Sequence, residues 1–421
     1  MAENIAGALS YIIKFRIDQG KLNRALDDLD GKVAGLNKSA QNLGRIGFQA
    51  VAAGAAVASA AMAKLAVDTV KVGANFENAM YVLASIRGVA VKNLKPLEDQ
   101  ARMLGATTLF TATQAAEGMQ QLARAGLEVN EIVLASGDAL AFAGANFVSM
   151  NQATTLTAAT MKQFNIQAHD AARITDTMTT AAQNSLFNVE GLATAMRYGG
   201  SAGSSLGATL EETVSMLAQF RDLGLESSMA GVRFRQSMLA LSAPTYKAKK
   251  ALEALGIGLD EVNPRVVGLE GAFKRLGKAG LTADQLVPIV NKISAADVAK
   301  ISGDIYRISE ASDDATGSVG AMVKKIEESR GVTKRTYEMV KASTVGQFQI
   351  LKSAFQELQL TIFDTLKGGP TGTKTEFKAI ADVLGNLKLV IDDVTTVIRT
   401  QGDYISKEFS EIFYLLLRAL Q

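Results

Sequence analysis

The chain has 421 residues, and its 44 Lys and Arg residues against 42 Asp and Glu residues leave a formal net charge of only +2. The absence of Cys excludes disulfide frameworks, thiolate zinc sites and cysteine nucleophiles, and a single His leaves a multi-histidine metal centre without ligands. The length allows two or three domains of ordinary size.

The composition favours helices. The five Pro residues leave a Pro-free run over residues 97–243, Trp is absent, and aromatic residues make up only 6% of the chain. We therefore predict an all-α fold in which coiled-coil N- and C-terminal helices flank a central multi-helix globular domain, with one short N-terminal strand. The N-terminus has no basic segment followed by an apolar core, so we do not expect secretion by the general pathway.

Residues 1–73 are predicted to contain a strand and then a heptad helix. Alternating apolar residues from Tyr11 to Ile17 indicate a short strand within a lead-in at residues 1–20. Over residues 21–73, apolar positions recur at alternating spacings of 4 and 3, which is typical of a coiled-coil seam; the alternative is one amphipathic helix packed on its own domain. The predicted oligomer seam consists of Leu22, Leu26, Leu29, Val33, Leu36 and Leu43.

Within this helix, residues 46–63 form an uncharged window rich in Ala and Gly, between Arg45 and Lys64. The window is at the lower limit of length for spanning a bilayer, and Ala contributes little transfer free energy, so a packed helix is favoured over a constitutive transmembrane helix. A third possibility is a helix packed in an oligomer at rest that enters a membrane only when released. The candidate membrane segment is represented by Phe48, Val51, Gly54, Val57 and Met62.

Residues 74–308 are predicted to form a globular domain of short helices. Thr111 with Gln114, and Thr209 with Glu212, have the spacing of capping boxes. Three glycines, each followed by an apolar residue, have the pattern of Schellman stops, at Gly126, Gly224 and Gly256. Residues 104–127 and 206–225 share the same start and stop phrase, which hints at duplicated helix pairs.

A polar linker is predicted at residues 309–320, followed by long coiled-coil helices at 321–421 with a break at 367–373. The second predicted oligomer seam consists of Phe377, Ile380, Leu384, Leu387, Ile391 and Val394. The mixed residue types at both seams do not fix the number of strands in the coiled coil. The apolar pattern is still running at Gln421, which indicates a tail that docks on a partner or a chain cut from a longer one.

No motif in the chain predicts catalysis. Residues 199–203, GGSAG, match the G-x-S-x-G form with Ser201 as nucleophile, but a helical pattern precedes them and the single His169 lies upstream, so we interpret the cluster as a loop. Residues 271–278 lack the spacing and the strand of a phosphate-binding loop. Three pairs of adjacent carboxylates are interpreted as partners of helix dipoles or as solvent-exposed surface residues, not as an acid/base pair. They are Glu211 and Glu212, Asp313 and Asp314, and Asp392 and Asp393. We predict no catalytic, metal-binding or cofactor-binding residues, no cofactor, and no sequence-specific nucleic-acid binding.

The central domain resembles the conserved core of phage tail tape measure proteins. The matching phrases occur in one order and spacing over roughly residues 70–300, and the N-terminal strand, heptad helix and small-residue segment fit the usual opening of the family. The phrases are ANFENAM at 74–80, the segment 104–127, LTAATMKQFNI at 156–166, DTMTTAAQNS at 176–185, the segment 206–244 and ALEALGI at 251–257.

The resemblance implies a structural protein, not an enzyme, of a phage tail or a phage-derived injection particle. Such a protein lies in the lumen of the tail tube, sets tail length during assembly in the host cytoplasm, and is released on ejection to aid DNA passage across the host envelope. The implied partners are the tail tube protein, baseplate or tail-tip hub proteins, tail assembly chaperones, the host membrane and further copies of the chain as a trimer or hexamer. The alternatives are a membrane-active, pore-forming helical protein acting outside a tail and, more distantly, a muralytic enzyme that uses Ser201 or a carboxylate.

Overall fold

The computed structural model describes residues 56–311 and 319–367, and contacts divide the chain after Asp68, so the account below concerns the part from Thr69 onward. The described residues form sixteen α-helices, α3 to α18, and three short 3-10 helices, η1 to η3, without any strand. The predicted all-α class is confirmed. The predicted strand and both predicted coiled-coil seams lie outside the described residues.

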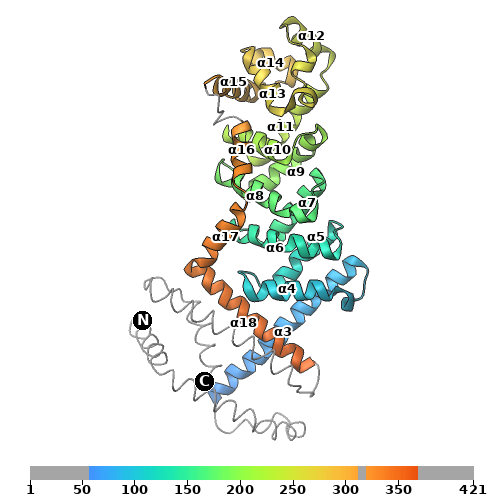
Figure 1. Cartoon of the computed structure of the whole chain (residues 1–421), viewed down its shortest axis with the longest axis vertical. Coiled ribbons are helices and arrows are strands. Elements are labelled where there is room, and N and C mark those ends of the chain that lie inside the picture. Colours follow the sequence, from blue (N-terminus) through green and yellow to red (C-terminus); the bar gives the residue numbers. More distant parts are fainter. Residues whose placement is uncertain (1–55, 312–318, 368–421) are drawn as a thin grey trace, which may run out of the picture. The chain divides into compact units, whose positions relative to one another are not determined.

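Helices α5 to α11 stack in two rows (Figure 1). In one row α5 (Ala112–Arg124), α7 (Met150–Phe164), α9 (Val189–Ser205) and α11 (Ser227–Ser242) pack one on the next. In the other row α6 (Val129–Ala145), α8 (Ala171–Gln183) and α10 (Leu210–Asp222) do the same. Each helix also packs on its chain neighbour in the opposite row, and α4 (Lys95–Thr107) packs on α5 and α6. We call residues 95–242 the array.

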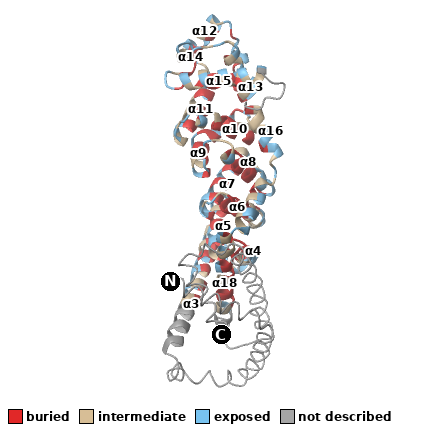
Figure 2. Cartoon of the chain, turned by 90° about the vertical axis from the view of Figure 1, so that its left-hand side faces the viewer, coloured by how far each residue is buried: buried red, intermediate tan, exposed pale blue. Residues whose placement is uncertain are grey.

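The array has a regular repeat. Helices of the first row begin at residues 112, 150, 189 and 227, so successive helix pairs start at a nearly constant interval along the chain. Stacked helix pairs in which each unit contacts its neighbours are characteristic of α-solenoids. Figure 2 shows the buried residues gathered in the interior of the stack.

Local signals set the ends of these helices. The Thr111 and Thr209 side chains each accept a hydrogen bond from the third helical residue, so both predicted capping boxes are confirmed. The predicted stops at Gly126 and Gly256 are confirmed by hydrogen bonds from Leu127 N to Leu122 O and from Ile257 N to Leu252 O. Gly224 also has the positive φ of such a stop, +85°.

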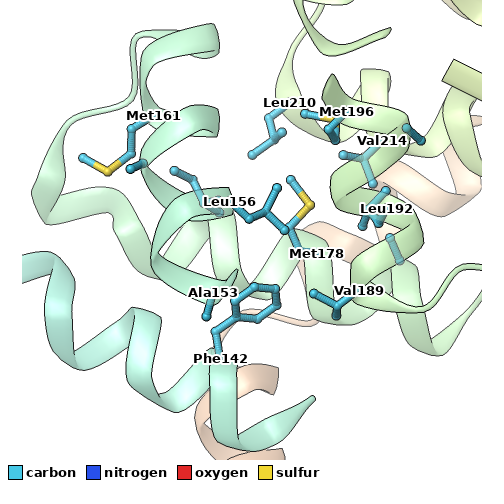
Figure 3. Packing of buried hydrophobic residues seen from close by; sticks show 14 of the residues in the cluster. Phe142, Ala153, Leu156, Met161, Met178, Val189, Leu192, Met196, Leu210 and Val214 are labelled. Carbon is cyan, nitrogen blue, oxygen red and sulfur yellow. The ribbon is translucent and has the colours of Figure 1, made fainter. Parts of the chain in front are cut away.

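One apolar core runs through the array. Side chains from five consecutive helices converge in it, as Figure 3 shows for Phe142, Leu156, Met178, Leu192 and Val214. Phe220 of α10 makes edge-to-face contacts with Phe234 of α11 and Phe273 of α13, each with ring centroids 6.2 Å apart. The core therefore continues from the array into the helices that follow it.

Those helices are α12 (Tyr246–Ala254), α13 (Pro264–Lys278), α14 (Ala283–Val290) and α15 (Ala295–Ala311), in which α13 and α14 both pack on α15. At the other end of the array, α3 (Ala56–Arg87) and η1 (Val91–Leu94) precede α4. The remaining 3-10 helices are η2 (Ala168–Asp170), before α8, and η3 (Leu259–Glu261), before α13.

The prediction of a loop at residues 199–203 is wrong, because these residues lie inside α9. The glycines are there for close packing. A Cβ on Gly231 of α11 would lie 2.4 Å from Ala195 O of α9, and one on Gly199 would lie 3.1 Å from Gly231 O. A Cβ on Gly203 would collide with Thr213 of α10. Small residues let three helices approach more closely than side chains would allow.

Three helices follow the gap at residues 312–318: α16 (Val319–Glu328), α17 (Val332–Ala342) and α18 (Thr344–Lys367). They run back along the array, because α16 packs on α10 and α8, α17 on α8 and α6, and α18 on α4 (Figure 1). We call residues 319–367 the returning arm. Of the predicted linker, residues 309–311 belong to α15 and residues 319–320 to α16; the division of the chain into domains stays a prediction.

Candidate functional site

The residues of the enzyme-like motifs do not meet in a reactive site. Ser201 is exposed on α9, without the strand that a nucleophile elbow requires. His169 has a side chain 68% exposed, and its Nε2 lies 3.4 Å from the Oδ2 of its neighbour Asp170. Residues 271–278 form the end of α13 and are not a loop. Within the ranges that the structure describes, no group of three or more His, Asp and Glu residues is placed to hold a metal ion.

The predicted membrane and seam residues stay predictions. Both seams, Phe48, Val51 and Gly54 lie outside the described residues, whereas Val57 and Met62 fall in α3. Among helices of the described segments, none combines the length and the apolar character that a bilayer span needs.

The most elaborate polar arrangement lies between the array and the returning arm. A cleft of about 870 Å³ is open there, with α6, η2 and α8 on one side and α16 and α17 on the other. Carboxylates outnumber cations on the array side of the cleft, whereas the arm side carries charges of both signs. The array contributes Asp138, Asp170, Asp176 and Glu211 together with Arg173, and the arm contributes Arg330 and Lys334 together with Glu327 and Glu338.

Asp176 joins the array to the start of α17. Its side chain belongs to α8 and is buried, and it accepts hydrogen bonds from Gly331 N at 2.6 Å and Thr333 N at 3.0 Å. The first turn of a helix has N–H groups without partners and a positive end of the helix dipole, so a carboxylate stabilises it. The Thr333 and Thr179 hydroxyls are hydrogen-bonded beside it, at 3.0 Å.

Tyr337, one turn further along α17, fits a gap left by a glycine. A Cβ on Gly144 of α6 would lie 2.5 Å from the Tyr337 ring, so only glycine leaves room for this aromatic side chain. The Tyr337 hydroxyl accepts a hydrogen bond from Leu109 N at 3.2 Å. Burial raises the pKa of Tyr337, so the side chain stays neutral in this position.

Charge on the array face is balanced partly by the arm. Burial alone would raise the pKa of Glu211, but the bidentate bonds from Arg173, at 2.6 and 2.7 Å, lower it, and Arg330 of the arm adds to this effect. Burial and the Asp176 carboxylate raise the pKa of Asp138, while Lys334 of the arm opposes the rise. The arm cations therefore stabilise the ionised carboxylates of the array.

At the far end of the arm the array supplies the cation and the arm supplies the carboxylates. Arg102 of α4 donates to Glu357 at 2.7 Å and to Thr361 at 3.1 Å, and it also pairs with Asp364. The Glu357 side chain is only 8% exposed, and burial raises its pKa although Arg102 opposes the rise. An acidic patch near α8 and a cation on α4 together fix the direction in which the arm lies.

Sequence reasoning missed these residues, because the partners are 155 positions apart for Asp176 and Gly331 and 255 for Arg102 and Glu357. No spacing rule links such distant positions. The one local sign is Gly331, which precedes α17 with φ +76° and has no side chain to cap the helix.

Most of the array lies in a segment that is similar to known phage tail proteins. The family model for phage-related minor tail proteins matches residues 98–293. The chain is 26% identical over 333 residues to the tape measure protein of Pneumococcus phage Dp-1, covering 78% of this chain and 27% of that protein. It is 26% identical over 296 residues to the probable tape measure protein of Escherichia phage P2, covering 68% of this chain and 35% of that protein. No solved structure matches the chain.

The resemblance to phage tail tape measure proteins is thereby confirmed. The chain spans only 27% and 35% of the length of these two relatives. The matched residues 98–293 run from α4 to just before α15 and leave out the returning arm.

Proposed function

We propose that this chain is a structural, non-enzymatic tape measure protein of a phage tail or a phage-derived injection particle. The observation that carries the proposal is the match to phage tail proteins over residues 98–293, the segment that contains the repeated helix array. In this proposal the chain lies in the lumen of the tail tube, sets tube length during assembly in the host cytoplasm, and leaves on ejection to aid DNA passage across the host envelope.

The proposed partners follow from this location. The tube protein surrounds the chain, baseplate or tail-tip hub proteins hold one end, and assembly chaperones keep the apolar seams covered before the tube closes. A six-fold tube accommodates three or six equivalent copies, which associate through the two predicted seams. The host membrane becomes a partner on ejection, through residues 46–63.

The array affects how the chain can act as a ruler. One continuous helix of 421 residues would reach roughly 630 Å, and the folded array shortens this reach. A solenoid keeps its contacts between neighbouring repeats, so it can extend one repeat at a time. The predicted helices outside the array supply the part whose length is read directly.

Tail length measured by electron microscopy tests the ruler. Deleting two heptads, residues 377–390, should shorten tails by about 20 Å, and duplicating them should lengthen tails by the same amount, because an α-helix rises about 1.5 Å per residue. The matched control replaces residues 377–390 with a Gly/Ser sequence of equal length, which keeps the residue count but removes the helix. Intact tails of unchanged length in both heptad variants would contradict the ruler.

A second candidate, a pore-forming helical protein that acts outside a tail, depends on the uncharged residues 46–63. It requires the purified protein to make liposomes leak without any tail particle. Replacing Val51 and Val57 with Asp should abolish leakage if this segment enters the bilayer, because charges at membrane depth are strongly disfavoured.

A further inference from the structure

The array face made by α4, α6, α8 and α10 binds helical segments, and the returning arm occupies it within the chain. We propose that this face also binds the returning arm of a second copy, so that neighbouring copies exchange residues 319–367. The inference rests on the proposed function in one respect, because that function places several copies side by side.

The face is specific for its ligand. Asp176 accepts the free N–H groups at the start of a helix, Gly144 leaves a gap for an aromatic ring one turn later, and Arg102 receives carboxylates at the far end. The acidic patch between them favours a helix whose first turns are basic. The returning arm has all four features in the required order: a helix start at Gly331, Lys334, Tyr337 and Glu357.

The interface has the character of one that can open. A cleft of about 870 Å³ lies inside it, and the charged contacts of Asp176 and Arg102 stand beside buried apolar side chains of the arm. Glu357 Oε2, at the Arg102 end of the interface, is buried and has no hydrogen-bond partner. Apolar side chains of the arm remain uncovered as well, with Met339 68% exposed and Val345 66% exposed. Interfaces between parts of one chain that combine charged and apolar contacts resemble transient contacts between proteins.

A second copy can supply the arm without any new contact. The hydrogen bonds described above between array and arm join residues more than 150 positions apart, and the array connects to the arm only through α12 to α15 and residues 312–318. The predicted C-terminal seam starts at Phe377, shortly after the arm ends at Lys367, so association there would hold several arms close to several arrays. Such tethering raises the effective concentration of the exchanged partner, and swapping an identical element between copies needs little free energy.

Cross-linking between two differently tagged full-length chains tests the exchange, and the absence of native Cys makes every introduced thiol unique. One chain carries Thr179→Cys in the array and the other carries Thr333→Cys in the arm, positions whose hydroxyl oxygens lie 3.0 Å apart. After co-expression and oxidation, we expect a disulfide-linked dimer that contains both tags and is lost on reduction.

The matched control places the two Cys residues of a contact within the array on separate chains. Gly191→Cys and Ser227→Cys lie on α9 and α11, where a Cβ on Gly191 would be 2.5 Å from Ser227 Oγ. In one chain this pair should cross-link, and in separate chains it should give no dimer, because the array does not exchange.

The exchange is contradicted if Thr179→Cys and Thr333→Cys cross-link within one doubly substituted chain but never between two chains. A second pair of positions covers the case in which substitutions at Thr179 or Thr333 prevent folding. Gln183 and Thr336 lie nearer the surface, with Gln183 Nε2 3.3 Å from Thr336 Oγ1. A short bismaleimide can join Cys residues placed at these two positions. A mixed dimer from either pair supports exchange, and its absence from both overturns it. The cross-linked dimer is detected with purified protein in solution, without tails. A missing dimer would therefore contradict the exchange, whereas an unchanged tail length would contradict only the ruler.

Discussion

Asp176 of α8 caps α17 although the two are 155 positions apart in the chain, because its two carboxylate oxygens accept hydrogen bonds from Gly331 N and Thr333 N. A buried residue of the array thus provides what a local N-cap side chain normally provides. Gly331, which occupies the N-cap position, has no side chain for this purpose. The start of α17 is therefore stable only while the arm lies on the array.

Replacing Asp176 with Ala should loosen the arm, because two backbone N–H groups lose their charged acceptor. Hydrogen bonds to a charged group contribute about 1.5 to 3 kcal/mol, so we expect a loss of about 2 kcal/mol in the free energy of unfolding of α17. Asp176→Asn keeps one acceptor oxygen and should lose less. Hydrogen exchange at the amides of α17 measures the effect.

Asp170→Ala is the control for this experiment, since Asp170 lines the same cleft but is exposed and caps nothing through its side chain. Its exchange rates should match those of the unmodified chain. Equal protection of α17 in the Asp176→Ala and Asp170→Ala variants would show that the distant cap is unimportant.

Glycine in the α9–α11 contact should be irreplaceable. Gly231→Ala would place a Cβ 2.4 Å from Ala195 O, a backbone atom that cannot rotate away, so the two helices must move apart. Overpacking of this kind costs about 1 to 3 kcal/mol or more, which urea unfolding can measure.

Gly137→Ala is the matched control, because Gly137 lies inside α6 and a Cβ there would meet no atom within 4 Å. Alanine is the better helix former, so this variant should be more stable by about 0.5 to 1 kcal/mol. A stabilised Gly231→Ala variant would mean that the close helix contact is absent in solution.

These residues show which parts of the fold a single sequence can reveal. Thr111, Thr209, Gly126 and Gly256 were predictable because their partners are near neighbours in the chain and the hydrogen bonds follow from local geometry. The regular repeat of helix pairs was only hinted at, because the shared phrase links α5 and α10, which occupy different rows of the array.

Gly199 and its neighbours were misinterpreted because the reason for a glycine there is another helix, not the local backbone. The same limit applies to the candidate site. Arg102 and Glu357 look like ordinary surface charges in the sequence. Only folding brings Arg102 Nε to 2.7 Å from Glu357 Oε1.

Asp138 gives the arm interface a pH dependence of predictable sign. Burial and the Asp176 carboxylate raise the pKa of Asp138 above the ordinary value of 3.8. The folded chain therefore keeps this proton at pH values where the unfolded chain has released it, so this contribution to stability falls as the pH rises from about 3.8 through the raised pKa. Asp138→Asn removes that fall and should raise the melting temperature at neutral pH relative to the unmodified chain.

Glu211→Gln should act in the opposite sense and serves as the comparison. The pKa of Glu211 lies below its ordinary value of 4.5 because the Arg173 pair outweighs burial, so its stabilisation is present above pH 4.5 and is lost as the pH falls through the folded pKa. The variant should be less stable at neutral pH and lose less on acidification. Melting curves across the acidic and neutral range that moved in the same direction for both variants would contradict this electrostatic account.

Arg102 should be needed mainly because Glu357 is buried. Arg102→Met leaves the Glu357 carboxylate, only 8% exposed, without its cation, and breaking a buried pair from one side costs about 3 kcal/mol. Adding Glu357→Leu removes the stranded charge and should recover much of the loss, because apolar side chains of similar volume often replace a buried pair without penalty. A double-mutant cycle on the unfolding of α18, followed by hydrogen exchange, measures the coupling between the two side chains. If the double variant were as unstable as Arg102→Met alone, the arm would be held at this end by packing of the buried Ile350 and Leu360 and not by the pair.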